Sequence, residues 1–274
     1  MSILSVLLRY IFCIILFFGS LHTFSQESRQ GTFYTVEKMY PDSRLDGYNL
    51  YLPPSYDADS SDFPVIVFLQ GGLGVGGEVD IIFNWALPRI LKETQTLTTD
   101  LDRMRMNTFV YVMPHIQKGQ FYENVPAISQ MLDELISTYR IDPRRIYLTG
   151  LSRGGHGTWG VASKMPERFA AIVPICGDQQ GVTDYQSLAE LPIWAAHNPK
   201  DNIVKYDYTQ SAVAKIEALS KTNFHQSKSI AAADWENHKR IFTSSSNPKK
   251  PHDAWTEVYN DMGFYRWLLR FQKE

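Results

Sequence analysis

Residues 147–155 read Tyr-Leu-Thr-Gly-Leu-Ser-Arg-Gly-Gly, a Gly-x-Ser-x-Gly pentapeptide between an apolar run and a stretch of helical character. In this context the pattern predicts a sharp turn from a strand into a helix, with Ser152 at the turn. Gly150 and Gly154 would let the two arms of the turn pass closely, because neither carries a Cβ atom. We therefore expect the hydroxyl of Ser152 to be exposed above the edge of a sheet, where it can act as a nucleophile.

The hydrophobic pattern around this turn indicates an α/β fold. Phe33–Val36 and Tyr48–Leu52 flank a turn-rich segment and predict an antiparallel hairpin. The runs that follow are continuously apolar, which suits strands buried on both faces of a parallel sheet. They occupy residues 65–69, 109–113, 145–149, 171–176 and 192–196, and a further strand is expected at 240–243.

Helical patterns lie between these runs. One begins at Pro126, and the last begins at about Asp253 and carries four core aromatic and aliphatic side chains at helical spacing. Lys221–Lys239 lacks a regular pattern and is expected to form a surface loop or insertion. The predicted fold is thus a mostly parallel central sheet with an antiparallel N-terminal hairpin and helices on both faces.

Length and composition favour one domain without a nucleic-acid partner. The 274 residues are 44% hydrophobic, which suits a single domain, here residues 26–274. With 27 Lys and Arg against 29 Asp and Glu, the formal charge is -2. No basic surface for nucleic acid or an anionic membrane is indicated.

The N-terminus has the pattern of a signal peptide over residues 1–25. Arg9 supplies a positive charge, Tyr10–Leu21 is apolar, and Thr23–Ser25 offers a small-x-small cleavage site. The apolar run is about 12 residues, short of the roughly 20 that a membrane-spanning helix needs. We expect export to the periplasm or medium, with no stable membrane insertion after cleavage. Cys176 would then be the one cysteine left, without a disulfide partner and with a packing role.

A serine nucleophile needs a histidine base and a carboxylate that orients it. In chain order the acid follows the serine after a late strand, and the histidine follows the last strand. His252 has that position and is the expected base, whereas the other histidines beyond residue 25 do not. Asp201 is the expected acid, with Asp178 and Asp207 as weaker alternatives.

Stabilising the oxyanion of the reaction requires two backbone N–H donors. Arg153 follows the nucleophile and is expected to supply one, and Gly72, in the glycine-rich segment 70–77, the other. A phosphate-binding loop is disfavoured because no Gly-Lys-Ser/Thr ending follows. This chemistry is complete with side chains and backbone groups, so no organic cofactor and no metal is expected.

Four stretches resemble the α/β-hydrolases of a bacterial esterase group, phospholipase/carboxylesterase-like proteins often called predicted peptidases, with feruloyl and acetyl xylan esterases among their relatives. They are residues 68–72, 141–159, 191–204 and 252–259. The resemblance implies the same nucleophile, acid and base, and the same two oxyanion donors. The chain departs from the family pattern at Gln70, usually histidine, at Arg153, commonly methionine, and at Asn198, commonly glycine.

These features predict an exported serine hydrolase that cleaves carboxylic esters through an acyl-enzyme on Ser152. The expected substrates are small-molecule or oligosaccharide esters, such as acyl groups on polysaccharides. A serine peptidase is less expected, because no separate propeller or lid domain is recognised. A non-catalytic binding protein on a hydrolase fold is the alternative from another class, and the sequence does not indicate an oligomeric state.

Overall fold

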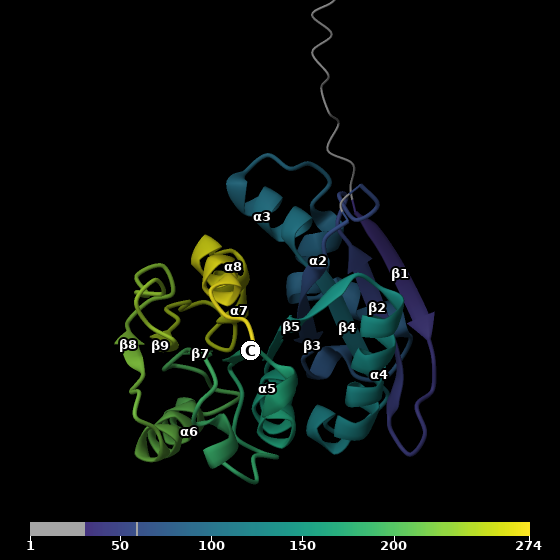
Figure 1. Cartoon of the computed structure of the whole chain (residues 1–274). Coiled ribbons are helices and arrows are strands. Elements are labelled where there is room, and N and C mark those ends of the chain that lie inside the picture. The colour runs from purple at the N-terminus through teal and green to yellow at the C-terminus, as the bar shows by residue number, and fades with distance from the viewer. Residues whose placement is uncertain (1–30, 59) are drawn as a thin grey trace, which may run out of the picture.

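The computed structural model describes residues 31–58 and 60–274. Residues 1–25, the predicted signal peptide, lie outside this described part. The centre of the described structure is one sheet with the strand order β1-β2-β4-β3-β5-β6-β7-β9-β8 (Figure 1). The strands are β1 (Thr32–Glu37), β2 (Leu45–Leu52), β3 (Phe63–Leu69), β4 (Val110–Ile116), β5 (Ile141–Leu151), β6 (Ala171–Ile175), β7 (Ile193–His197), β8 (His225–Ser227) and β9 (Arg240–Ser244).

The pairing of these strands agrees with the pattern of apolar residues. β1 and β2 form the predicted antiparallel hairpin, and β2 also runs antiparallel to β4. From β4 to β8 every neighbouring pair is parallel. The central strands β3 and β4 are buried throughout, as expected for strands covered on both faces.

Helices cover the two faces of the sheet and enclose two hydrophobic cores. On one face α4 (Val125–Thr138), α5 (Arg153–Lys164) and α6 (Tyr206–Leu219) contribute buried side chains to one core. On the other face α2 (Ala86–Glu93), α3 (Asp100–Thr108), α7 (Trp255–Tyr259) and α8 (Met262–Leu269) pack on the second core (Figure 1). This layering is the one predicted from the sequence.

Two local expectations need correction. The last helical segment is divided, because α7 ends before Asn260 and the side chain of Asp261 caps α8 by accepting a hydrogen bond from the N–H of Gly263. The irregular segment 221–239 contains β8, which extends the sheet by pairing with β9. The division of the last helix is stabilised locally by the Asp261 cap, whereas β8 depends on its pairing with β9.

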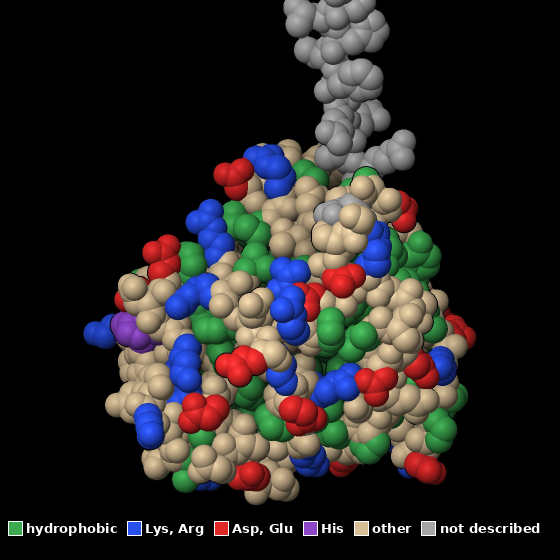
Figure 2. Space-filling model, viewed as in Figure 1, with side chains coloured by type: hydrophobic (Ala, Val, Ile, Leu, Met, Phe, Trp, Pro, Cys, Tyr) green, Lys and Arg blue, Asp and Glu red, His purple; other side chains and the backbone are tan. Residues whose placement is uncertain are grey.

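The surface carries charges of both signs. On the face seen in Figure 2, Lys and Arg side chains are interspersed with Asp and Glu. Through residues 31–58 and 60–274, no helix combines the length and the apolar character that a membrane crossing requires.

Candidate active site

Ser152 occupies a strained turn between β5 and α5. Its φ and ψ are 54° and -117°, a conformation that is unfavourable for a residue with a side chain. The turn depends on Gly154, two residues after Ser152, because a Cβ atom there would lie 1.9 Å from the carbonyl oxygen of Leu69 in β3. The sequence pattern thus corresponds to a turn that no larger residue at position 154 could form.

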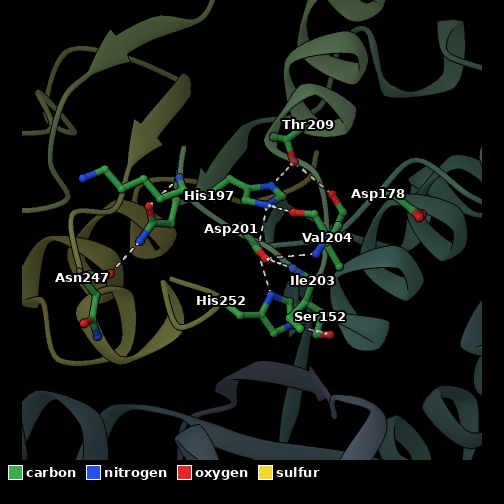
Figure 3. A network of polar contacts seen from close by, with 12 residues as sticks. Ser152, Asp178, His197, Asp201, Ile203, Val204, Thr209, Asn247 and His252 are labelled. Carbon is green, nitrogen blue, oxygen red and sulfur yellow. Dashed lines mark hydrogen bonds and ion pairs between the residues drawn. The ribbon is translucent and has the colours of Figure 1, made fainter. Parts of the chain in front are cut away.

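Ser152, His252 and Asp201 form one hydrogen-bonded row (Figure 3). Nε2 of His252 lies 2.9 Å from Oγ of Ser152, and Nδ1 of the same ring lies 2.7 Å from Oδ2 of Asp201. The His252 side chain is 20% exposed, whereas that of Asp201 is fully buried. The structure therefore brings together the three side chains that the sequence analysis selected, with the ring of His252 partly open to solvent.

Asp201 lies in the loop after β7 and accepts four hydrogen bonds. They come from the rings of His252 and His197 and from the N–H groups of Ile203 and Val204. Burial alone would raise the pKa of this carboxyl, but the hydrogen bonds outweigh it and lower the pKa to about 2. The carboxylate is thus ionised near neutral pH and can hold the Nδ1–H of His252.

His197 is a polar contact behind Asp201 that the sequence analysis did not identify. Its ring is fully buried at the end of β7, and Nε2 lies 3.1 Å from Oδ2 of Asp201 and 3.0 Å from the carbonyl oxygen of Val204. Both neighbours are acceptors, so Nε2 carries a proton and donates it. On the other side Nδ1 lies 2.7 Å from Oγ1 of Thr209, which in turn lies within bonding distance of the Gly177 carbonyl. The acid therefore lies between two histidine rings.

The alternative acids lie elsewhere. Asp178 stands apart from the row in Figure 3. Its carboxylate lies 3.1 Å from Nδ1 of His156, and that nitrogen also accepts the N–H of Asp178 at 2.7 Å. A single ring nitrogen cannot donate to one group and accept from the other, and the shorter contact favours the acceptor role. Asp207 is exposed in the first turn of α6.

The remaining histidines serve other contacts. His115 is buried in β4 with Nδ1 2.7 Å from Asp46. His225 and His238 stack face to face at the β8 edge, with ring centroids 4.2 Å apart. Neither contact reaches Ser152, in agreement with the exclusion from chain order.

Two of the three departures from the family pattern have structural roles. Asn198, after β7, donates from Nδ2 to the carbonyl oxygen of Asn247, five residues before His252. Its Oδ1 accepts the N–H of Lys200, and so it ties the loop of the acid to the loop of the base. Gln70 is buried and donates to the carbonyl oxygen of Gly74. Gln70 therefore braces the glycine-rich loop from behind.

Gly72 and Arg153 each begin a helical turn beside Ser152. Gly72 opens the 3₁₀ turn Gly72–Gly74, and Arg153 is the first residue of α5. The first N–H groups of a helix have no acceptor within it. Of the backbone bonds recorded for the described residues, none is donated by either N–H. Both groups are thus available to a ligand atom at Ser152.

Cys176 lies close to the acid and the base of the row. It follows β6 with a φ of 47°, is fully buried, and its thiol lies within 4.8 Å of ligand atoms of Asp201 and His252. This is the one group of three that could approach a metal ion among residues 31–58 and 60–274. Asp201 and His252 already form a hydrogen bond with each other. Burial raises the pKa of the Cys176 thiol and so disfavours the thiolate that a metal ion would need. We assign no metal to it.

Two cavities meet at Ser152. The aromatic cavity has a volume of about 130 Å³ and is lined by Gly72, Leu73, Trp85, Ala86, His252 and Trp255. The polar cavity has a volume of about 410 Å³; its lining includes Gln120, Arg153, His156, Asp178, Gln180, Ile203 and Tyr208, and Gly72 borders both cavities. The two cavities differ in polarity. The two parts of a ligand that is bound at Ser152 would therefore lie in chemically different cavities.

Comparisons with known proteins agree with this architecture. A model of the prolyl oligopeptidase family matches residues 115–226. A bifunctional acetylxylan esterase/xylanase of Neocallimastix patriciarum is 29% identical over 171 residues, 60% of this chain and 23% of that protein. A poly(3-hydroxyalkanoate) depolymerase of Paucimonas lemoignei is 43% identical over 51 residues, 19% of this chain and 12% of that protein. The chain thus spans less than a quarter of the length of either relative.

Solved structures share the fold at low sequence identity. A thermostable esterase has a TM-score of 0.64 at 20% identity, over 90% of this chain and 64% of that one. A feruloyl esterase module of Clostridium thermocellum, in complex with sinapinate, has a TM-score of 0.59 at 16% identity, over 87% of this chain and 88% of that one. The sheet order and these structures together show the α/β-hydrolase fold. Within that fold class, the chain is similar in sequence to an acetylxylan esterase/xylanase and similar in fold to a feruloyl esterase module.

Proposed function

We propose that the protein is a serine hydrolase that cleaves carboxylic esters through an acyl-enzyme on Ser152. The observation that carries the proposal is the hydrogen-bonded row, with Oγ of Ser152 2.9 Å from Nε2 of His252 and Nδ1 2.7 Å from Asp201. A serine hydroxyl becomes nucleophilic when a base takes its proton, and a carboxylate keeps that base in the correct tautomer.

The proposed reaction has two halves. Oγ of Ser152 attacks the ester carbonyl carbon while Nε2 of His252 takes the hydroxyl proton. The oxyanion that forms accepts hydrogen bonds from the backbone N–H groups of Gly72 and Arg153. His252 then gives the proton to the leaving oxygen as the bond to the alcohol breaks. Water attacks the acyl-enzyme by the same route and releases the acid. Asp201 holds the ring throughout.

The surroundings of Ser152 favour an ester carried by a larger molecule. Of the large hydrophobic side chains that are exposed in the described part of the chain, four line the two cavities: Leu73, Trp85, Ile203 and Tyr208. Exposed apolar and aromatic groups gathered at one site indicate a binding surface. Acyl groups on polysaccharides fit this surface, and the relatives named for acetylxylan and feruloyl esters support that class.

The test is hydrolysis of a short-chain aryl ester by Ser152→Ala. We expect turnover to fall to the background rate, and Ser137→Ala, an exposed position in α4, to keep the activity of the unaltered protein. A fluorophosphonate probe should label the unaltered protein and not Ser152→Ala. Unchanged turnover in Ser152→Ala would contradict the proposal, and absence of labelling would favour a binding protein. An aminoacyl anilide in the same assay tests for peptidase activity.

Export of residues 26–274 as a single domain is part of the proposal. It is supported by the signal-peptide pattern of residues 1–25. Mass spectrometry of the protein recovered outside the cytoplasm should show a mature N-terminus at Gln26. Recovery of the full-length chain from the membrane fraction would contradict this.

A further inference from the structure

The two cavities divide the ester at Ser152 into its acyl and alcohol parts; the assignment rests on the proposed function. The leaving oxygen must receive its proton from Nε2 of His252, so it has to lie on the side of that ring. His252 lines the aromatic cavity and not the polar one. The alcohol therefore leaves through the aromatic cavity, and the acyl group extends into the polar cavity.

Arg153 gives the polar cavity its positive charge. Nη1 donates to the carbonyl oxygen of Gly119 at 2.7 Å, which fixes the direction of the side chain. Nε lies 3.7 Å from the position that a Cβ atom at Gly72 would take, so the guanidinium borders the expected oxyanion site. The group is thus held beside the carbonyl carbon that Ser152 would attack.

The guanidinium keeps free donors. Among residues 31–58 and 60–274, no carboxylate lies within 4.0 Å of it, and Nε and Nη2 have no recorded partner. Neither nitrogen is among the fully buried polar atoms that lack a partner in that part of the chain, so both have accessible surface, and the residue itself lines the polar cavity. An arginine with free donors is suited to bind a carboxylate through two hydrogen bonds.

The other charged or titratable side chains on the cavity wall are Asp178, His156 and the phenol of Tyr208. The carboxylate of Asp178 accepts hydrogen bonds from the N–H and the side-chain amide of Gln180, both at 2.8 Å. Its acceptor capacity is therefore largely used within the protein. The open donors of Arg153 make the guanidinium the group that is left to select a ligand.

We propose that Arg153 selects acyl groups that carry a carboxylate at their far end, such as half-esters of dicarboxylic acids. The negative charge would lie in the polar cavity against the guanidinium, and the reacting carbonyl would remain at Ser152. The side chain of Arg153 would thereby determine specificity, in addition to the backbone N–H that the proposed mechanism uses.

The experiment compares two aryl esters with the same leaving group: the half-ester of glutaric acid and the ester of 5-methylhexanoic acid, in which two methyl groups replace the carboxylate oxygens. The measured quantity is the ratio of kcat/KM for the two esters, corrected for spontaneous hydrolysis. We expect Arg153→Met to lower this ratio roughly tenfold or more, because charge-assisted hydrogen bonds are lost. Arg153→Lys should keep part of it, and Arg266→Met, at an exposed position in α8, should leave it unchanged.

The outcomes separate this inference from the proposed function. Hydrolysis of the neutral ester by Arg153→Met shows that the variant is folded, and loss of that activity in Ser152→Ala tests the proposed function. An unchanged ratio in Arg153→Met would overturn the selection of anionic acyl groups. A third substrate, the acetate ester of an aryl leaving group that carries a carboxylate, tests the assignment of the two cavities. A dependence on Arg153 that appears with this ester alone would overturn that assignment.

Discussion

The buried contact between His197 and Asp201 can be tested with two substitutions that each keep half of it. The side-chain amide nitrogen of Gln can occupy the position of the ring nitrogen Nε2, and that of Asn the position of Nδ1. His197→Gln therefore keeps the donor to Asp201, and His197→Asn keeps the contact to Thr209. Both variants remove the ring, so the cost of lost packing is similar.

The expected difference follows from the partners. Hydrogen bonds to a charged group contribute about 1.5–3 kcal/mol, and those between neutral groups about 0.5–1.5 kcal/mol. His197→Asn loses the charged contact and His197→Gln the neutral one, so the free energy of unfolding should be lower in His197→Asn by about 1 kcal/mol or more. Urea unfolding at neutral pH measures it.

Turnover should separate the same two variants. If about 1.4 kcal/mol of the lost contact is needed to hold Asp201 against His252 in the transition state, kcat falls about tenfold in His197→Asn. KM for an aryl ester should stay the same, because His197 lines neither cavity. Equal stability and equal kcat in the two variants would refute a positioning role for this contact.

Three further predictions concern acid, packing and metal. The folded-state pKa of Asp201 is about 2, below the usual 3.8. The ionised carboxylate therefore contributes about 2 kcal/mol to the free energy of unfolding above pH 4, and this contribution is lost as the pH falls toward 2. Asp201→Asn should remove this pH dependence from a plot of the free energy of unfolding against pH. Gly154→Ala should lower the free energy of unfolding by about 3 kcal/mol or more, since its Cβ would meet the Leu69 oxygen at 1.9 Å, whereas Gly72→Ala, with 3.7 Å to its nearest neighbour, should remain folded in a thermal melt. Dialysis against EDTA should leave ester hydrolysis unchanged, and loss of activity that zinc restores would contradict the assignment of no metal at Cys176.

Most strands of the sheet, and the set of Ser152, His252 and Asp201, could be predicted from the sequence because each has a physical requirement that limits the residues at its positions. Strands buried on both faces are continuously apolar, and the turn at Ser152 needs glycine at 154. Chain order then selected His252 and Asp201 from many candidates. The structure places these two with Ser152 at hydrogen-bonding distance.

Contacts between distant segments could not be predicted in the same way. His197 is the last residue of β7, and only the folded loop after it shows that its ring reaches Asp201. β8 has three residues and depends on pairing with β9. The break between α7 and α8 did leave a signal, because Asp261 is a common residue at the start of a helix. That signal was outweighed by the aromatic residues spaced as in one helix.

The hydrogen bond between Asn198 and Asn247 has a consequence for protein engineering. The two loops that it joins are separated in sequence by α6, β8 and β9, yet they hold the acid and the base at one distance. A graft that replaces the acid loop with a sequence that has glycine at position 198 would remove the Asn198 amide and release the base loop. The two loops should therefore be exchanged as a pair, and Thr209 of α6, which contacts His197 behind the acid, should be kept with them.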